Sequence, residues 1–148
     1  MLRRSRAREV ALQVLFEHDL NKTPMSAAAV AKFVRDRMVN DAESVAFCSE
    51  LLAGVSAHRA EIDAAITETA ENWRLSRMLP SDRNVLRLAV YELLHHAQQV
   101  PVPVLLNEAI ELARRFGTVD SPGFVNGLLD KLARRRAKAT ESPAAPPA

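Results

Sequence analysis

The sequence predicts an all-α fold of about seven helices, arranged as two small helical bundles in contact. Apolar residues recur every three or four positions along most of the chain, and no segment shows the sustained alternation that marks a strand. Aromatic residues make up only 5% of the chain, so the core consists mainly of Leu, Val and Ala, which suits closely packed helices. At 148 residues the chain has the length of one domain.

The first predicted helix, residues 2–20, combines a core-building half with a basic half. At 100° per residue its apolar stripe consists of Ala7, Val10, Ala11, Leu12, Val14, Leu15 and Phe16. Its opposite, solvent-facing side carries Arg6, Glu9, Gln13 and Glu17. Arg4 and Arg8, one turn apart, lie over the apolar stripe, where charged groups cannot remain in an oily core. This end of the helix is therefore predicted to run past the core or into a groove, where the two arginines can meet an anion.

Four further helical segments follow, separated by short polar or proline-containing breaks: residues 26–38, 45–55, 57–71 and 81–94. Gly54 lies between two of these segments and marks either a close-packing site or a bend. Residues 73–79 form a short segment that Pro80 ends. Ser81 is expected to cap the next helix, with Asp82 close to its positive N-terminal dipole.

The last third of the sequence predicts two more helices and a tail. Pro101 and Pro103 exclude residues 98–103 from a helix interior, so the next helix is predicted over 104–116, followed by Gly117 as a C-cap. Ser121 followed by proline begins the final helix. These elements predict one helical domain over 1–139 and a disordered, low-complexity tail over 140–148. Within the domain, Pro80 separates an N-terminal bundle, about 3–79, from a C-terminal bundle, about 80–138.

Charge is distributed unevenly along the chain, although the net charge is only +2. Residues 1–8 and 131–138 hold nine of the 20 basic residues and no acidic residue. Residues 9–130 hold 11 basic and 17 acidic residues, a net of −6. A polyanion is therefore expected to bind at the two ends. The alternative is that the basic termini only aid solubility.

No residue pattern indicates catalysis, a metal site, a cofactor or a membrane. His95 and His96 are adjacent and fit a surface or helix-end pair, while His18 and His58 are isolated in the sequence. The single cysteine, Cys48, lies in an apolar run and is predicted to be a buried hydrophobe. No signal peptide and no apolar run of about 18 residues is present. We predict a cytoplasmic binding protein that is not an enzyme.

Five motifs, in order and at matching spacing, make the chain similar to a known family across roughly residues 3–133. The motifs are residues 6–9 (RARE, followed by Ala11, Gln13 and Leu15-Phe16), 51–55 (LLAGV), 85–93 (VLRLAVYEL), 107–113 (NEAIELA) and 120–127 (DSPGFVNG). In these motifs the chain resembles the NusB family of bacterial transcription antitermination factors. The resemblance implies an all-helical protein that binds the boxA element of ribosomal RNA leader transcripts. It does so as a heterodimer with the small-subunit ribosomal protein NusE and joins the RNA polymerase antitermination complex.

The resemblance also implies which residues bind. The candidate RNA-binding residues are Arg3, Arg4, Arg6, Arg8, Gln13, Asp120 and Phe124. The candidate NusE-binding residues are Phe16, Asp82 and Glu92. Arginine suits the first role because its forked donors match phosphate and its plane stacks on bases. Phe124 fits either base stacking or a core contact.

Two other functions fit the same helices. One is the RNA-binding module of a ribosomal-RNA cytosine methyltransferase, which requires that the chain be a fragment, because it holds no methyl-donor glycine motif and no catalytic cysteine pair. The other is a helical adaptor that does not bind RNA. A homodimer in which the arginine-bearing helix is buried is a further alternative.

Overall fold

The computed structural model describes residues 3–39, 41–71 and 73–141. Within these ranges the chain forms seven α-helices and one short 3-10 helix, which confirms the predicted all-α fold class. The helices are α1 (Arg3–Leu20), α2 (Ala27–Met38), α3 (Ala42–Ala57), α4 (Arg59–Thr69), η1 (Leu75–Arg77), α5 (Pro80–His95), α6 (Val102–Phe116) and α7 (Ser121–Glu141).

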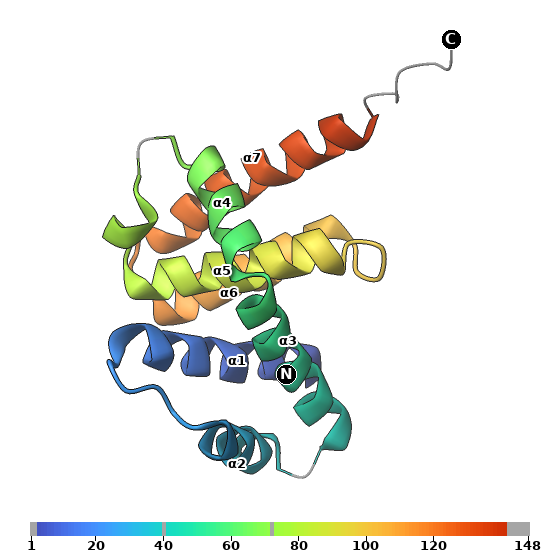
Figure 1. Ribbon diagram of the computed structural model, residues 1–148. Coiled ribbons are helices and arrows are strands. Elements are labelled where there is room, and N and C mark those ends of the chain that lie inside the picture. Colours follow the sequence, from blue (N-terminus) through green and yellow to red (C-terminus); the bar gives the residue numbers. More distant parts are fainter. Residues whose placement is uncertain (1–2, 40, 72, 142–148) are drawn as a thin grey trace.

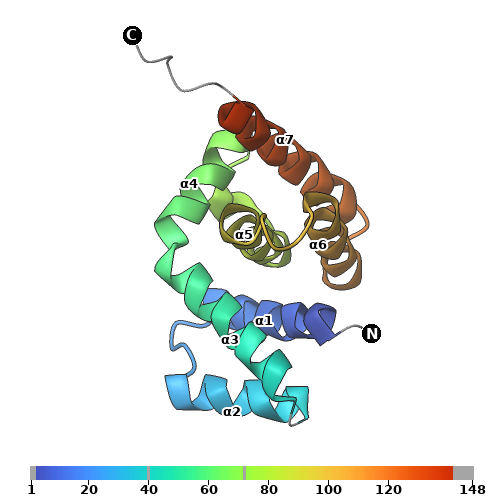
Figure 2. The same ribbon diagram turned by 90° about the vertical axis from the view of Figure 1, so that its right-hand side faces the viewer.

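The helices pack as two stacked groups (Figures 1 and 2). One group contains α1, α2 and α3, and the other contains α4, α5, α6 and α7, with α1 packed against α5 between them. The chain passes from one group to the other where α3 meets α4 at His58. The boundary at Pro80 stays a prediction, because α4 precedes Pro80 but packs against α5 and α7.

The core is built from the aliphatic side chains that the helical pattern selects. The predicted inner stripe of α1 is buried from Ala7 to Leu15, since Ala7, Val10 and Ala11 are 0% exposed, whereas its last member, Phe16, is 36% exposed. Cys48 is fully buried as predicted, and this burial raises the pKa of its thiol to about 12. The thiol is therefore a packing group rather than a nucleophile.

Helix ends follow the capping residues, and the starts of the two helices with proline in the first turn differ from the prediction. Asp41 and Ser26 cap α3 and α2, each accepting a backbone N–H with its side chain. Ser81 is not a cap, because α5 begins at Pro80 and proline occupies the first turn. Helix α6 begins two residues earlier than predicted, at Val102, because Pro103 lies in the first turn, where an N–H has no intrahelical partner.

At two glycines the missing side chain lets a neighbouring residue pack directly against the backbone, and neither glycine adopts an unusual backbone angle. A Cβ atom at Gly54 would overlap the ring of Tyr91, which decides for the close-packing interpretation of this residue. Gly117 is the C-cap of α6 as predicted, with an extended φ of −102°. A Cβ atom there would overlap the side chain of Ser121, so the space beside α7 requires glycine.

The last helix is longer than predicted. Helix α7 continues to Glu141, two residues into the segment predicted as a tail, whereas residues 142–148 lie outside the described residues. Its C-terminal half still packs against α4, because Leu132 is buried and Arg135 donates to the backbone carbonyl of Glu68. Among the described helices, none has the length and apolar character that crossing a membrane requires.

Candidate functional site

The first turn of α1 presents three arginines at the molecular surface. Arg3 pairs with Asp41 at 3.2 Å and with Glu43 at 2.7 Å, and Arg6 pairs with Glu9 at 3.1 Å. Arg4 is exposed, and its guanidinium carbon lies 4.4 Å from the centre of the Phe47 ring. No carboxylate in the described part of the chain pairs with Arg4. Its guanidinium group is therefore the most available to an external anion.

Arg8 lies inside the protein, and the expectation that its head group meets an external anion is wrong in this structure. Its Nε and Nη2 atoms donate to the two carboxylate oxygens of Glu92 at 2.8 and 2.9 Å. Arg8 is 3% exposed and Glu92 is 2% exposed. The anion that Arg8 meets thus comes from its own chain, and a role of Arg8 in RNA binding stays a prediction.

Glu9 was expected to face solvent but is 5% exposed. It accepts hydrogen bonds from Arg6 at 3.1 Å and from Arg115 at 2.8 Å, so it joins α1 to the end of α6. The sequence pattern did not single out Arg115, because its partner is more than a hundred residues away.

A mostly apolar groove of about 400 Å³ lies at the C-terminal half of α1. Its lining consists of Leu12, Gln13, Phe16, Glu17, Leu20, Asn21, Ser81 and Phe116. Phe16, Phe116 and Leu20 are 36%, 37% and 55% exposed, which is unusual for large apolar side chains in one cluster. We call this surface the Phe16 groove. It contains Gln13, which places that residue with Phe16 rather than with the N-terminal arginines.

The other two candidate partner-binding residues are not at the surface. Asp82 is 6% exposed and follows Ser81 of the Phe16 groove, while Glu92 is buried with Arg8. Helices α1 and α5 run antiparallel, since Asp19 contacts Arg83 at one end and Arg8 contacts Glu92 at the other. The structure therefore brings Asp82 close to the Phe16 groove and places Glu92 at the opposite end of α5.

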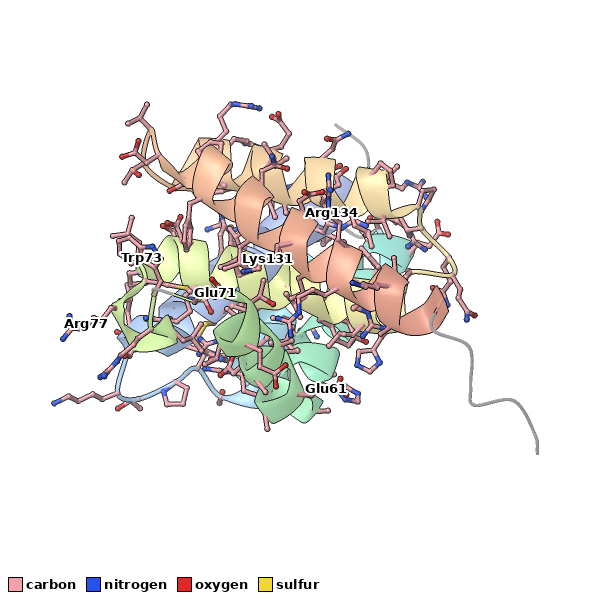
Figure 3. All side chains as sticks on the ribbon, turned by 90° about the horizontal axis from the view of Figure 1, so that it is seen from above. Glu61, Glu71, Trp73, Arg77, Lys131 and Arg134 are labelled. Atoms are coloured by element: carbon pink, nitrogen blue, oxygen red, sulfur yellow. The ribbon has the colours of Figure 1, made fainter. Side chains whose placement is uncertain are left out.

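A second candidate surface surrounds Phe124. Asp120 is exposed, and Phe124 is half-buried against the core, with its ring 6.1 Å from that of Trp73 in an edge-to-face arrangement. Trp73 is 57% exposed. A groove of about 340 Å³, which we call the Trp73 groove, is lined by Thr69, Ala70, Glu71, Trp73, Gly123, Phe124, Gly127, Leu128 and Lys131. Lys131 donates to Glu71 at 2.8 Å across this groove (Figure 3).

The two sets of candidate RNA-binding residues are not adjacent. Ser5, beside Arg4, donates to Glu108 in the middle of α6 at 2.7 Å. Asp120 follows the end of α6 at Phe116, roughly 12 Å of helix rise from Glu108.

The fold also assembles a cluster that sequence reasoning missed. His58 was expected to be isolated, but its ring nitrogen, a Glu61 oxygen and a His95 ring nitrogen all lie within 4.8 Å of one another. The i, i+3 spacing of His58 and Glu61 was the available signal, whereas His95 joins them only through the packing of α5 against α4.

Comparisons with known proteins agree with this fold. The model of the NusB family matches residues 5–134. A protein of Anaeromyxobacter dehalogenans (strain 2CP-1), named "Transcription antitermination protein NusB", is 46% identical over 88% of this chain and 90% of its own length. The structure of NusB from T. maritima is 34% identical, with a TM-score of 0.78, covering 88% of this chain and 90% of that one.

A third comparison bears on the fold alone. A chain in a crystal structure of the antitermination factors NusB and NusE in complex with dsRNA is 22% identical, with a TM-score of 0.78, over 90% of this chain and 97% of that one. The family model spans most of the chain, and the Anaeromyxobacter relative covers 88% of it. The chain therefore belongs to the NusB family.

Proposed function

We propose that this chain is a transcription antitermination factor that binds boxA-type RNA together with the ribosomal protein NusE and joins the RNA polymerase antitermination complex. Its membership of the NusB family and the names of its relatives support this role. The observation that carries RNA binding is Arg4, an exposed arginine without a carboxylate partner in the described residues. The role is one of binding rather than catalysis, and it belongs in the cytoplasm, where transcription takes place.

The first turn of α1 would bind the RNA backbone. The guanidinium carbon of Arg4 lies 4.4 Å from the centre of the Phe47 ring, a cation–π contact that restricts the motion of this side chain before any ligand arrives. Arg3 and Arg6 flank it. The pair of Arg3 with Glu43 is exposed, so phosphate can replace that carboxylate, whereas the partner of Arg6, Glu9, is buried and leaves only the Arg6 side chain half-exposed. Arg8 would act indirectly: its buried pair with Glu92 fixes the turn from which the other arginines project.

The Trp73 groove would extend the RNA site. Two aromatic rings, Trp73 and Phe124, border one groove with the cation of Lys131 at its edge. Aromatic faces stack on bases irrespective of sequence, and a cation beside them binds the adjoining phosphate. Asp120 immediately precedes α7 and would orient this end rather than attract the polyanion.

The Phe16 groove would bind NusE. Its exposed rings, Phe16 and Phe116, offer the aromatic anchors on which protein interfaces depend. Residues 9–130 have a net charge of −6, which favours association with a basic ribosomal protein. Asp82 lies next to this groove and would contribute its charge from a buried position.

The test is filter binding with a short boxA RNA and a scrambled RNA of equal length, each with and without purified NusE. We expect preference for boxA, tighter binding when NusE is present, and a steep loss of affinity as salt increases. Equal affinity for both RNAs, with no effect of NusE, would contradict the proposed function.

A further inference from the structure

We propose that His58, Glu61 and His95 form a binding site for a divalent transition-metal ion, with Zn²⁺ as the best match. This site is independent of RNA and NusE binding. Glu61 Oε1 lies 2.9 Å from His95 Nε2 and 3.9 Å from His58 Nδ1. All three ligand atoms lie within 4.8 Å of one another.

The ligands come from two helices that meet at one point. His58 is the junction residue between α3 and α4, Glu61 lies in the first turn of α4, and His95 is the last residue of α5. Figure 3 shows Glu61 on the outer side of α4. His95 reaches the other two ligands only if the crossing of α5 with the α3–α4 junction is set accurately.

The contact between Gly54 and Tyr91 sets that crossing. Gly54 lies one turn before His58, and Tyr91 lies one turn before His95. Because Gly54 has no side chain, the Tyr91 ring lies directly against α3, which brings the following turns together. The Tyr91 ring then packs behind both imidazoles, with ring centres 6.1 Å from His58 and 5.2 Å from His95.

The chemistry of the three ligands selects the ion. Two imidazole nitrogens and one carboxylate oxygen are a ligand set typical of zinc sites with an open fourth position. Zn²⁺ bonds of about 2.0–2.1 Å in a tetrahedron place ligand atoms roughly 3.3 Å apart, between the two observed distances to Glu61. Calcium and magnesium prefer oxygen ligands alone, so they fit this set poorly.

The two imidazole rings lie close enough together to share one ion. The His58 and His95 rings are 4.1 Å apart, at an interplanar angle of 35°. The three side chains are 30% to 56% exposed, so an ion and a water ligand can enter from solvent.

The experiment is a titration of the full, untagged chain with zinc sulfate by calorimetry, supported by a competing chromophoric chelator. We expect one Zn²⁺ per chain. Glu61→Gln and His95→Ala should each weaken binding at least tenfold, because lost second-shell contacts alone weaken metal binding by about 10–100-fold. Glu68→Gln on α4 and His18→Ala on α1, matched substitutions outside the cluster, should bind as the unmodified chain does. Absence of saturable binding, or equal binding by the Glu61 variant, would overturn the site.

Imidazole NMR of the unmodified chain provides a second measurement that does not depend on any variant. Adding Zn²⁺ should shift the ring signals of His58 and His95 and leave those of His18 unchanged. Zn²⁺-dependent shifts at His18 or His96 in place of His58 would place the ion elsewhere and refute the proposal.

Discussion

Arg8 and Glu92 form a buried, bidentate ion pair that joins the start of α1 to the end of α5. Neither residue is more than 3% exposed, and Glu108 lies 3.7 Å from the same guanidinium group. Removing such charges from water costs several kcal/mol per ion, so the pair is tolerated because its hydrogen bonds are well made. The pair ties the arginine-bearing turn to the centre of the fold.

Loss of one member of this pair should therefore destabilise the protein strongly. Glu92→Gln removes the bidentate partner of the buried Arg8 guanidinium and leaves only the carboxylate of Glu108, at 3.7 Å, as a counter-charge. We expect a loss of about 3–5 kcal/mol in the free energy of unfolding, measured in urea. Glu43→Gln is the matched control, because its partner Arg3 is exposed and the expected loss is below about 1 kcal/mol. Equal losses in the two variants would show that burial of the pair contributes nothing.

Arg4 should be the arginine whose loss weakens RNA binding without weakening the fold. We expect Arg4→Ala to reduce affinity roughly tenfold, at about 1–2 kcal/mol for a charged contact, and to lower the slope of log affinity against log salt by about one. Arg37→Ala is the control, since Arg37 lies 4.7 Å from the Phe33 ring on α2 in the same kind of contact. An equal effect of the two substitutions would remove the first turn of α1 from the RNA site.

Phe16 should be needed for NusE and dispensable for RNA binding by the isolated chain. Phe16→Ala removes an aromatic anchor of the Phe16 groove, and we expect NusE to bind about tenfold or more weakly in calorimetry. Val119→Ala tests a comparably apolar but unrelated position, because Val119 is 94% exposed outside this groove. Asp82→Lys is a poorer test, since Asp82 is 6% exposed and a buried lysine would also disturb folding. Unchanged NusE affinity in Phe16→Ala would exclude the groove as its binding surface.

Gly54 should tolerate no side chain. Gly54→Ala forces a methyl group into the Tyr91 ring, and overpacking of this kind costs about 1–3 kcal/mol, measurable as a lower melting temperature. Gly127→Ala, where no neighbouring atom lies within 4 Å, should instead stabilise α7 by about 0.5–1 kcal/mol. A neutral Gly54→Ala would mean that α3 and α5 can separate without penalty.

Asp19 should contribute to acid unfolding. Burial alone raises its pKa, but hydrogen bonds from Arg83 and Asn84 and the charges of Arg83 and Arg87 outweigh it and hold the pKa below its usual value. A lowered pKa contributes stability that is present above the unfolded value of 3.8 and is lost as pH falls through the folded value. Asp19→Asn should therefore flatten the decline of unfolding free energy below about pH 4.

Urea unfolding at pH 3 to 7 measures this decline, with Asp120→Asn, an exposed position, as the control. A decline in Asp19→Asn as steep as in the unmodified chain would assign the acid sensitivity to other carboxylates.

The helices themselves were predictable because their signals are local. The apolar spacing along α1, the capping by Ser26 and the glycine that ends α6 act over a few residues. The start of α6 was predicted two residues late, because a proline that excludes a helix interior is acceptable in the first turn.

The candidate site was predictable only in part, because its partners are distant in the sequence. Periodicity places Arg8 over the apolar stripe. That Glu92 is its partner becomes apparent only from the packing of α5 against α1. The same holds for Glu9, which looks solvent-facing until α6 brings Arg115 across it. The cluster of His58, Glu61 and His95 likewise depends on a helix crossing that no local pattern encodes.

Ion pairs join α1 to α5 at both ends, between Arg8 and Glu92 and between Asp19 and Arg83. Helix α1 therefore acts as a rigid spacer between its two exposed surfaces. The interval from Arg4 to Phe16 fixes both the separation and the relative direction of whatever binds at each end. One inserted residue within that interval would lengthen the spacer by about 1.5 Å and rotate one surface by about 100° against the other. Two ligands held in register by such a spacer would lose their alignment even though every contact residue remained in place.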